Sequence, residues 1–128
     1  MKKIISLIAA VAMALGVCSC NSKIENPTER NFIGTWDLQR TEIIGTSGSV
    51  TTSQPNTLDY LVFTENSISF YDADKLSKQA KFAVKDNVIF VDGIATYKID
   101  NLTRKEMTLS VDGIGLLVTS YRYYYTKR

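Results

Sequence analysis

Apolar and polar residues alternate in short runs along most of this chain. The alternation is clearest at 80–85, where Phe82 and Val84 would face a core while Lys81 and Lys85 face water. A period of two residues is typical of a strand with one buried face. We therefore expect strands at 34–44, 50–53, 58–63, 67–71, 80–85, 88–91, 94–99, 107–111 and 116–126. Between them, residues 72–78 predict a polar loop or one helical turn, and residues 100–105 predict a polar loop.

Short turn sequences separate these segments. Asp92-Gly93 predicts a two-residue hairpin turn with positive φ, and Asp86-Asn87 predicts a second turn. Counting 50–53 and 58–63 as one interrupted strand gives eight strands joined in sequence. The predicted fold class is all-β: a small, eight-stranded antiparallel up-and-down barrel, closed by pairing of its long first and last strands. A β-sandwich is the alternative.

The first twenty residues have a different character. Lys2 and Lys3 precede an apolar stretch from Ile4 to Val17. A membrane-spanning helix needs about 20 apolar residues, and this stretch is too short. Residues 1–19 therefore predict an export signal.

The end of that signal contains both cysteines of the chain. Val17-Cys18-Ser19-Cys20 resembles the lipobox of bacterial lipoproteins, which implies cleavage after residue 19 and lipid on Cys20. Cys18 is disfavoured as the acceptor because β-branched Val17 would then stand where a small residue is required. An ordinary secretory signal with incidental cysteines is the alternative. Residues 20–31 are polar, contain Pro27 and predict a flexible tether, so the barrel domain is expected at 32–128.

Charge and composition exclude several functions. Removing Lys2 and Lys3 from the 15 basic residues leaves 13, against 13 acidic ones, with no run of like charges, so no nucleic-acid partner is expected. The chain has no His, and acylation of Cys20 leaves the mature chain without a free thiol. Disulfides, His-dependent triads and the common zinc sites are thereby excluded. We expect no enzymatic activity, no metal and no cofactor.

Two short motifs carry a resemblance to a known family. Gly34-Thr35-Trp36 resembles the Gly-x-Trp that opens lipocalins and fatty-acid-binding proteins, and Arg122-Tyr123-Tyr124 matches the Arg-x-Tyr of their last strand. In these families the Trp closes one end of the barrel, while the Arg either helps to hold a carboxylate inside or packs on the Trp. The chain is most similar to short lipocalin-like lipoproteins of Bacteroides-type bacteria, which are calycin-like barrels. The resemblance implies a ligand site containing Trp36, Arg122 and Tyr124.

The inward face of the last strand has two alternatives. Either Arg122 and Tyr124 point into the barrel, or Tyr121, Tyr123 and Tyr125 do. The second arrangement buries more aromatic surface, at about 1.5–3 kcal/mol for each ring, and is favoured.

The first strand poses a related problem, because Trp36 and Leu38 share a face with Arg40 and Glu42 under strict alternation. Burying that charge pair is costly unless it is satisfied. Either the strand outruns the barrel, which is favoured, or the lumen is wet.

These features predict a membrane-anchored lipocalin-like lipoprotein that binds a small hydrophobic or amphipathic ligand. The alternative is a non-catalytic structural or interaction subunit of an outer-membrane protein complex, with a barrel filled by side chains. A lumen of about 300 Å³ or more would favour the ligand-binding alternative. The expected partners are the membrane, through the lipid on Cys20, and either that ligand or an envelope protein. Asn21 after the lipidated cysteine implies, by resemblance to Gram-negative lipoproteins, the outer membrane, with the periplasmic face and the cell surface both open.

Overall fold

The computed structural model describes residues 22–113 and 118–128. The expected signal peptide, Cys20 and the start of the last expected strand at 116–117 lie outside the described residues. Within the described residues, nine strands form one antiparallel sheet. They are β1 (Gly34–Gly45), β2 (Val50–Ser53), β3 (Tyr60–Phe63), β4 (Ser67–Asp72), β5 (Lys75–Lys85), β6 (Val88–Val91), β7 (Ile94–Leu102), β8 (Glu106–Asp112) and β9 (Val118–Lys127).

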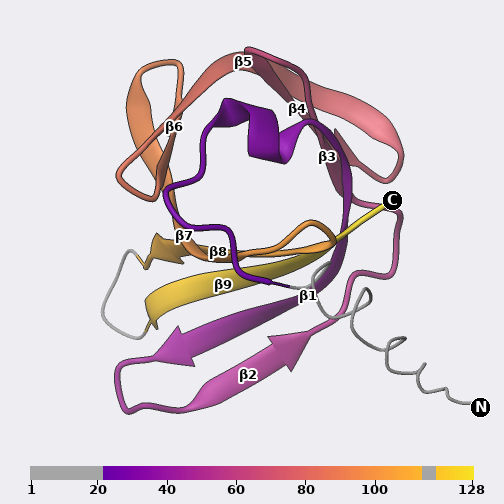
Figure 1. Cartoon of the computed structure of the whole chain (residues 1–128). Coiled ribbons are helices and arrows are strands. Elements are labelled where there is room, and N and C mark those ends of the chain that lie inside the picture. Colours follow the sequence, from indigo (N-terminus) through magenta and orange to yellow (C-terminus); the bar gives the residue numbers. More distant parts are fainter. Residues whose placement is uncertain (1–21, 114–117) are drawn as a thin grey trace, which may run out of the picture.

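The sheet closes into a barrel because its first long strand pairs with its last. Residues 34–37 of β1 pair with β3, residues 41–44 pair with β2, and β9 runs along the other side of β1. Eight strands, β1 and β3–β9, therefore make the barrel, and β2 is an extra strand on a hairpin that extends beyond the ring (Figure 1). The expected eight-stranded antiparallel barrel is confirmed. The stretches 50–53 and 58–63, expected as one interrupted strand, are two strands with different positions along β1.

Three hairpin turns use positive φ at both central residues. Asp86-Asn87 and Asp92-Gly93 lie at the expected positions, with φ of +52° and +61° in the first turn and +51° and +80° in the second. The third turn is Ala73-Asp74, at +51° and +63°. Alanine rarely adopts this conformation, so the sequence carries no signal for that turn.

The prediction of loops at 72–78 and 100–105 is wrong over part of each range. β5 begins at Lys75, and β7 continues to Leu102. Residues 75–79 are exposed on both faces of the strand, and backbone pairing with β4 holds them in place. Because neither face is buried, their sequence shows no alternation of apolar and polar residues. In β7 a register shift between Ile99 and Asn101 interrupts the alternation.

The segment that precedes β1 plugs one end of the barrel, which we call the closed end. The 3-10 helix η2 (Glu29–Phe32) lies within the outline of the ring (indigo in Figure 1). The Phe32 ring is fully buried, 5.4 Å from the Phe63 ring and 6.4 Å from the Phe82 ring between centroids. Trp36, also fully buried, donates from Nε1 to the Phe32 carbonyl oxygen at 2.8 Å. The expected closure of one end by Trp36 thus involves Phe32 as its partner.

Residues 24–31 differ from the tether that their polarity predicts. The Ile24 amide donates to the Leu102 carbonyl at 2.7 Å, and Pro27 is buried. The Val84 amide donates to the Glu29 carboxylate at 2.7 Å and lowers the pKa of that group. This segment packs through a few irregularly spaced contacts, which leave no periodic pattern in the sequence.

Side chains fill the barrel from the closed end toward the other, open end. The described core runs from Phe32 to Tyr125, with Ile24 packed against it. Tyr123 and Tyr125 are on the inner face, so the arrangement of β9 that buries aromatic rings is the one observed. Because the described core begins at Ile24, a chain starting at Ser22 contains all of it.

A β-bulge resolves the conflict on the first strand. The pairing of β1 with β9 skips Gln39 between Leu38 and Arg40. One extra residue reverses the alternation. Trp36 and Leu38 therefore belong to the inner face, while Arg40 and Glu42 lie on the outer face. β1 does continue beyond the ring, as expected, but the bulge is what keeps this charge pair out of the core.

Gly34 adopts a backbone conformation that side chains disfavour, with φ of +135°, and a Cβ there would lie 2.6 Å from Lys127 Cε. We expect Gly34→Ala to lower the free energy of unfolding by about 1–3 kcal/mol, measured by urea denaturation. Gly48→Ala is the control, because Gly48 has φ of +87° but open space around the added Cβ. Equal losses in the two variants would contradict a role for the Lys127 contact.

Candidate functional site

The outer face of β1 and β9 carries a network of paired charges. Glu42 Oε1 accepts hydrogen bonds from Tyr124 Oη at 2.7 Å and from Arg122 Nη1 at 3.1 Å. The Arg40 guanidinium lies 3.6 Å from the centroid of the Tyr124 ring, and Arg122 Nε lies 3.7 Å from Asp100 Oδ2. Each charge in this network has a partner within the protein.

The structure brings together two of the three residues that the resemblance assigns to a ligand site. Arg122 and Tyr124 converge on one carboxylate, but it is the protein's own Glu42, on the outer face. Trp36 lies on the inner face at the closed end. The three side chains are thus divided between the two faces of the barrel wall, and Arg122 and Tyr124 are not part of the lumen.

This network makes part of the stability depend on pH. The hydrogen bond from Tyr124, followed by the contacts with Arg122, lowers the pKa of Glu42. The stabilisation is therefore complete above about pH 4.3, the value for an unfolded chain, and is lost as the pH falls through the lower value of the folded state. We expect Glu42→Gln to be less stable than the natural chain at pH 7 and to approach its stability below pH 4, measured by urea denaturation across that range. Glu65→Gln, in the exposed β3–β4 turn, is the control, and a constant difference for Glu42→Gln would contradict the pairing.

The lumen retains a small recess at the open end. Its volume is about 190 Å³, and inward-facing side chains that line it include Leu38, Leu61, Phe70, Tyr97 and Tyr125. Burial raises the pKa of Tyr97 to about 12 and that of Tyr125 well above its ordinary value. Both hydroxyls are therefore neutral at physiological pH. The lining of the recess is mostly aromatic and apolar, and it also includes Asp59 and Asp72.

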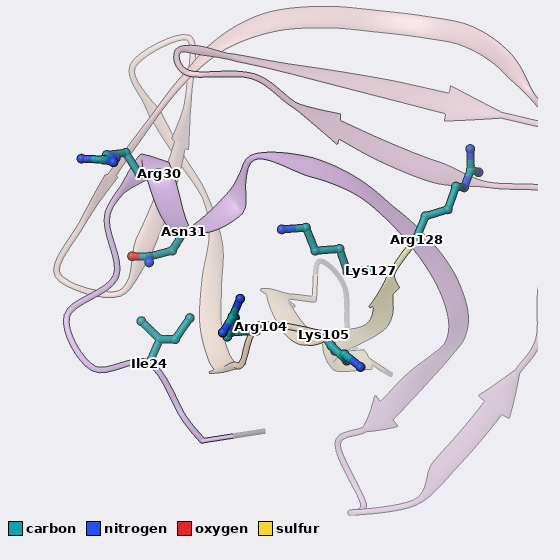
Figure 2. Close-up of a pocket in the computed structure, with 7 residues that line it drawn as sticks. All are labelled: Ile24, Arg30, Asn31, Arg104, Lys105, Lys127 and Arg128. Carbon is teal, nitrogen blue, oxygen red and sulfur yellow. The ribbon is translucent and has the colours of Figure 1, made fainter. Parts of the chain in front are cut away.

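A larger pocket of about 650 Å³ lies at the closed end. We call it the closed-end pocket, and Figure 2 shows the seven residues that line it: Ile24, Arg30, Asn31, Arg104, Lys105, Lys127 and Arg128. Five of the seven are basic and none is acidic. In Figure 2 Lys127 and Arg104 extend into the space between the segments, whereas Arg30 and Arg128 point outward at opposite sides.

The topology explains why these cations meet. β8 begins and β9 ends at the closed end, where the Lys127 amide donates to the Lys105 carbonyl at 2.8 Å. The loop carrying Arg104 therefore lies beside the C-terminal residues, and the segment before β1 contributes Arg30. Sequence reasoning missed this pocket because the cations are dispersed along the chain. The available signal was that both basic pairs, 104–105 and 127–128, fall at strand ends that an up-and-down barrel places together.

The plug positions the central cation of this pocket. Lys127 Nζ lies 5.5 Å from the centroid of the Trp36 ring. The Lys127 side chain passes over Gly34, where a Cβ would obstruct it. The Gly-x-Trp motif thus both closes the barrel and provides the surface on which Lys127 lies.

Most of these cations are not neutralised by neighbouring acids. No carboxylate of the described residues forms an ion pair with Arg30, Arg104, Lys105 or Lys127, whereas Arg128 Nη2 lies 2.7 Å from Asp37 Oδ1. An excess of positive charge around a recess attracts anions. The closed-end pocket is therefore chemically suited to an anionic group.

Residues 22–113 and 118–128 contain no group of three potential metal-ligating side chains. In the same part of the chain, no helix is long and apolar enough to cross a membrane. Comparisons of the chain with protein-family models, curated proteins and solved structures found no match.

Proposed function

We propose that this chain is a lipid-anchored protein of the bacterial cell envelope whose filled barrel serves as a non-catalytic interaction module. The anchor is the lipid on Cys20, and the membrane is the outer membrane, as the sequence around Cys20 suggests. The barrel presents its outer surface and its two ends to other envelope components instead of carrying a ligand inside.

The observation that supports this proposal most strongly is the packing of the lumen. Aromatic side chains from η2, β1, β3 and β5 meet at the closed end, with the Phe63 and Phe82 rings 5.0 Å apart between centroids. The recess of about 190 Å³ at the open end is smaller than the roughly 300–1,000 Å³ of typical small-molecule sites.

A second candidate function is the binding of a small amphipathic molecule in that open-end recess. It is favoured by the aromatic lining and by the neutral hydroxyl of Tyr97, which would hydrogen-bond a polar group of the ligand. A ligand of this volume would be smaller than a fatty acid. This candidate function therefore covers smaller ligands than the lipocalin-like carrier expected from the sequence.

Native mass spectrometry of the chain from Ser22 to Arg128, purified without organic solvent from the producing bacterium, tests the proposal. The filled barrel predicts the mass of the polypeptide alone, unchanged after incubation with fatty acids and small aromatic compounds. A co-purified molecule that is lost on unfolding, and absent from Tyr97→Trp, which narrows the recess, would overturn the proposal in favour of the second candidate. Phe90→Trp is the control substitution, because Phe90 does not line the recess and alternates along β6 with the buried Ile89 and Val91.

A further inference from the structure

We propose that the closed-end pocket binds the phosphate of a lipid headgroup in the membrane that anchors the protein. This inference rests on the proposed function, because it takes the lipid on Cys20 as given. The ligand chemistry is a phosphate ester at a membrane surface, and the residues that contact it are Lys127 and Arg104, with Asn31 at the pocket wall.

The shape and charge of the pocket fit such a group. Its volume of about 650 Å³ exceeds what one phosphate requires and leaves room for the attached alcohol of a headgroup. Lys127 and Arg104 extend toward the same space from β9 and from the β7–β8 loop (Figure 2). Lysine binds phosphate as a point charge, and arginine offers a planar fork of donors that matches phosphate oxygens.

No acidic residue lines the pocket, and two acidic residues near it, Glu29 and Asp37, already have partners. Glu29 is the acidic residue of η2, and it accepts the hydrogen bond from the Val84 amide. Asp37 is engaged by Arg128, through Nη2 at 2.7 Å and Nε at 3.3 Å. The four remaining cations of the pocket, Arg30, Arg104, Lys105 and Lys127, pair with no carboxylate of the described residues.

The distance to the anchor identifies the membrane as the source of the phosphate. Ile24 lines the pocket and is fixed to the barrel by its hydrogen bond to the Leu102 carbonyl. Only four residue steps separate Cys20 from Ile24, so an extended chain spans at most about 14 Å. The pocket is thereby confined to the neighbourhood of the headgroups, within roughly one to two Debye lengths at physiological salt.

The test uses the chain from Ser22 to Arg128, which contains the whole described core but no lipid anchor, so binding depends on the protein surface alone. Its co-sedimentation is measured with phosphatidylcholine vesicles, with and without phosphatidylglycerol. We expect binding only to the phosphatidylglycerol vesicles. Because each basic residue near an anionic surface contributes roughly fivefold to partitioning, the double variant Arg104→Gln/Lys127→Gln should bind about 25-fold more weakly.

Three controls separate the pocket from net charge and from misfolding. Lys75→Gln/Lys78→Gln removes the same charge from exposed positions of β5, toward the open end, and should retain binding within about twofold because distant charges are screened. Arg104→Lys/Lys127→Arg keeps the charge and should retain most of the binding. Unchanged thermal unfolding of each variant shows that the barrel is intact.

A second measurement distinguishes the headgroup from free phosphate. Inorganic phosphate is titrated into the same chain, and the NMR signals of the Lys127 and Arg104 side chains are followed. Saturable phosphate binding without vesicle binding would overturn the membrane assignment, as would vesicle binding that both double Gln variants weaken equally. Failure of the anchor itself is detected separately, by the absence of fatty-acid label on Cys20 in cells.

Discussion

Replacing Trp36 with alanine is expected to lower the free energy of unfolding by about 3–5 kcal/mol, as is typical of a buried tryptophan truncated to alanine. Trp36 is fully buried, and its Nε1 donates to the Phe32 carbonyl at 2.8 Å. The substitution therefore leaves a cavity at the closed end and removes the hydrogen bond that holds η2 in place. Urea denaturation followed by circular dichroism measures the loss.

The conservative variant Trp36→Phe separates packing from hydrogen bonding. It restores much of the ring volume but leaves the Phe32 carbonyl without its donor, so a loss of about 1–3 kcal/mol is expected. If Trp36→Ala changed the free energy of unfolding by less than about 0.5 kcal/mol, as surface substitutions do, the closed-end plug described above would be wrong.

The second large effect concerns the membrane anchor. Cys20→Ser is expected to abolish incorporation of a fatty-acid label into the protein, because the thiol that forms the thioether is removed. If it carries two or more acyl chains, at roughly 0.8 kcal/mol for each buried CH₂, the natural protein is expected to stay with the membrane through extensive washing. Detergent-phase partitioning of the mature form and metabolic labelling with an alkyne fatty acid measure the effect.

Cys18→Ser is the matched control for this prediction, since it changes the neighbouring thiol by the same atom. It should keep full labelling, because Ser at this position is still a small residue. Loss of label in Cys18→Ser but not in Cys20→Ser would place the lipid on Cys18 and contradict the prediction. Equal labelling of both variants and of the natural protein would contradict lipidation at either position.

The sequence is most informative where secondary structure and burial coincide. Phe82 and Val84 alternate with lysines, so β5 is recognisable there, whereas residues 75–79 of the same strand are exposed on both faces and carry no pattern. The bulge at Gln39 was not predictable, because a single inserted residue reverses the faces without any change in composition. One indication of it was present in the sequence: strict alternation would have placed the charged residues Arg40 and Glu42 on the buried face.

The candidate sites depend on contacts between distant segments, which one sequence does not specify. Arg122 and Tyr124 matched the spacing of a carboxylate clamp, but spacing alone does not say which carboxylate they hold or on which side of the wall. The closed-end pocket combines residues from three places in the chain. It follows from the order of strands in an up-and-down barrel, once the segment before β1 is known to fold back against that end.

Measuring which end of the barrel faces the membrane tests the proposed headgroup site most directly. Cys20 is the only cysteine expected in the mature chain, and its thiol is expected to be acylated, so a cysteine added elsewhere should be the only free thiol. A fluorophore is placed through Glu65→Cys, in the β3–β4 turn at the closed end, or through Lys75→Cys, beside the β4–β5 turn at the open end. The lipidated protein is then reconstituted into vesicles that contain headgroup-labelled quencher lipids. We predict strong quenching at position 65 and weak quenching at position 75, whereas equal quenching, or stronger quenching at position 75, would contradict a closed end that faces the membrane.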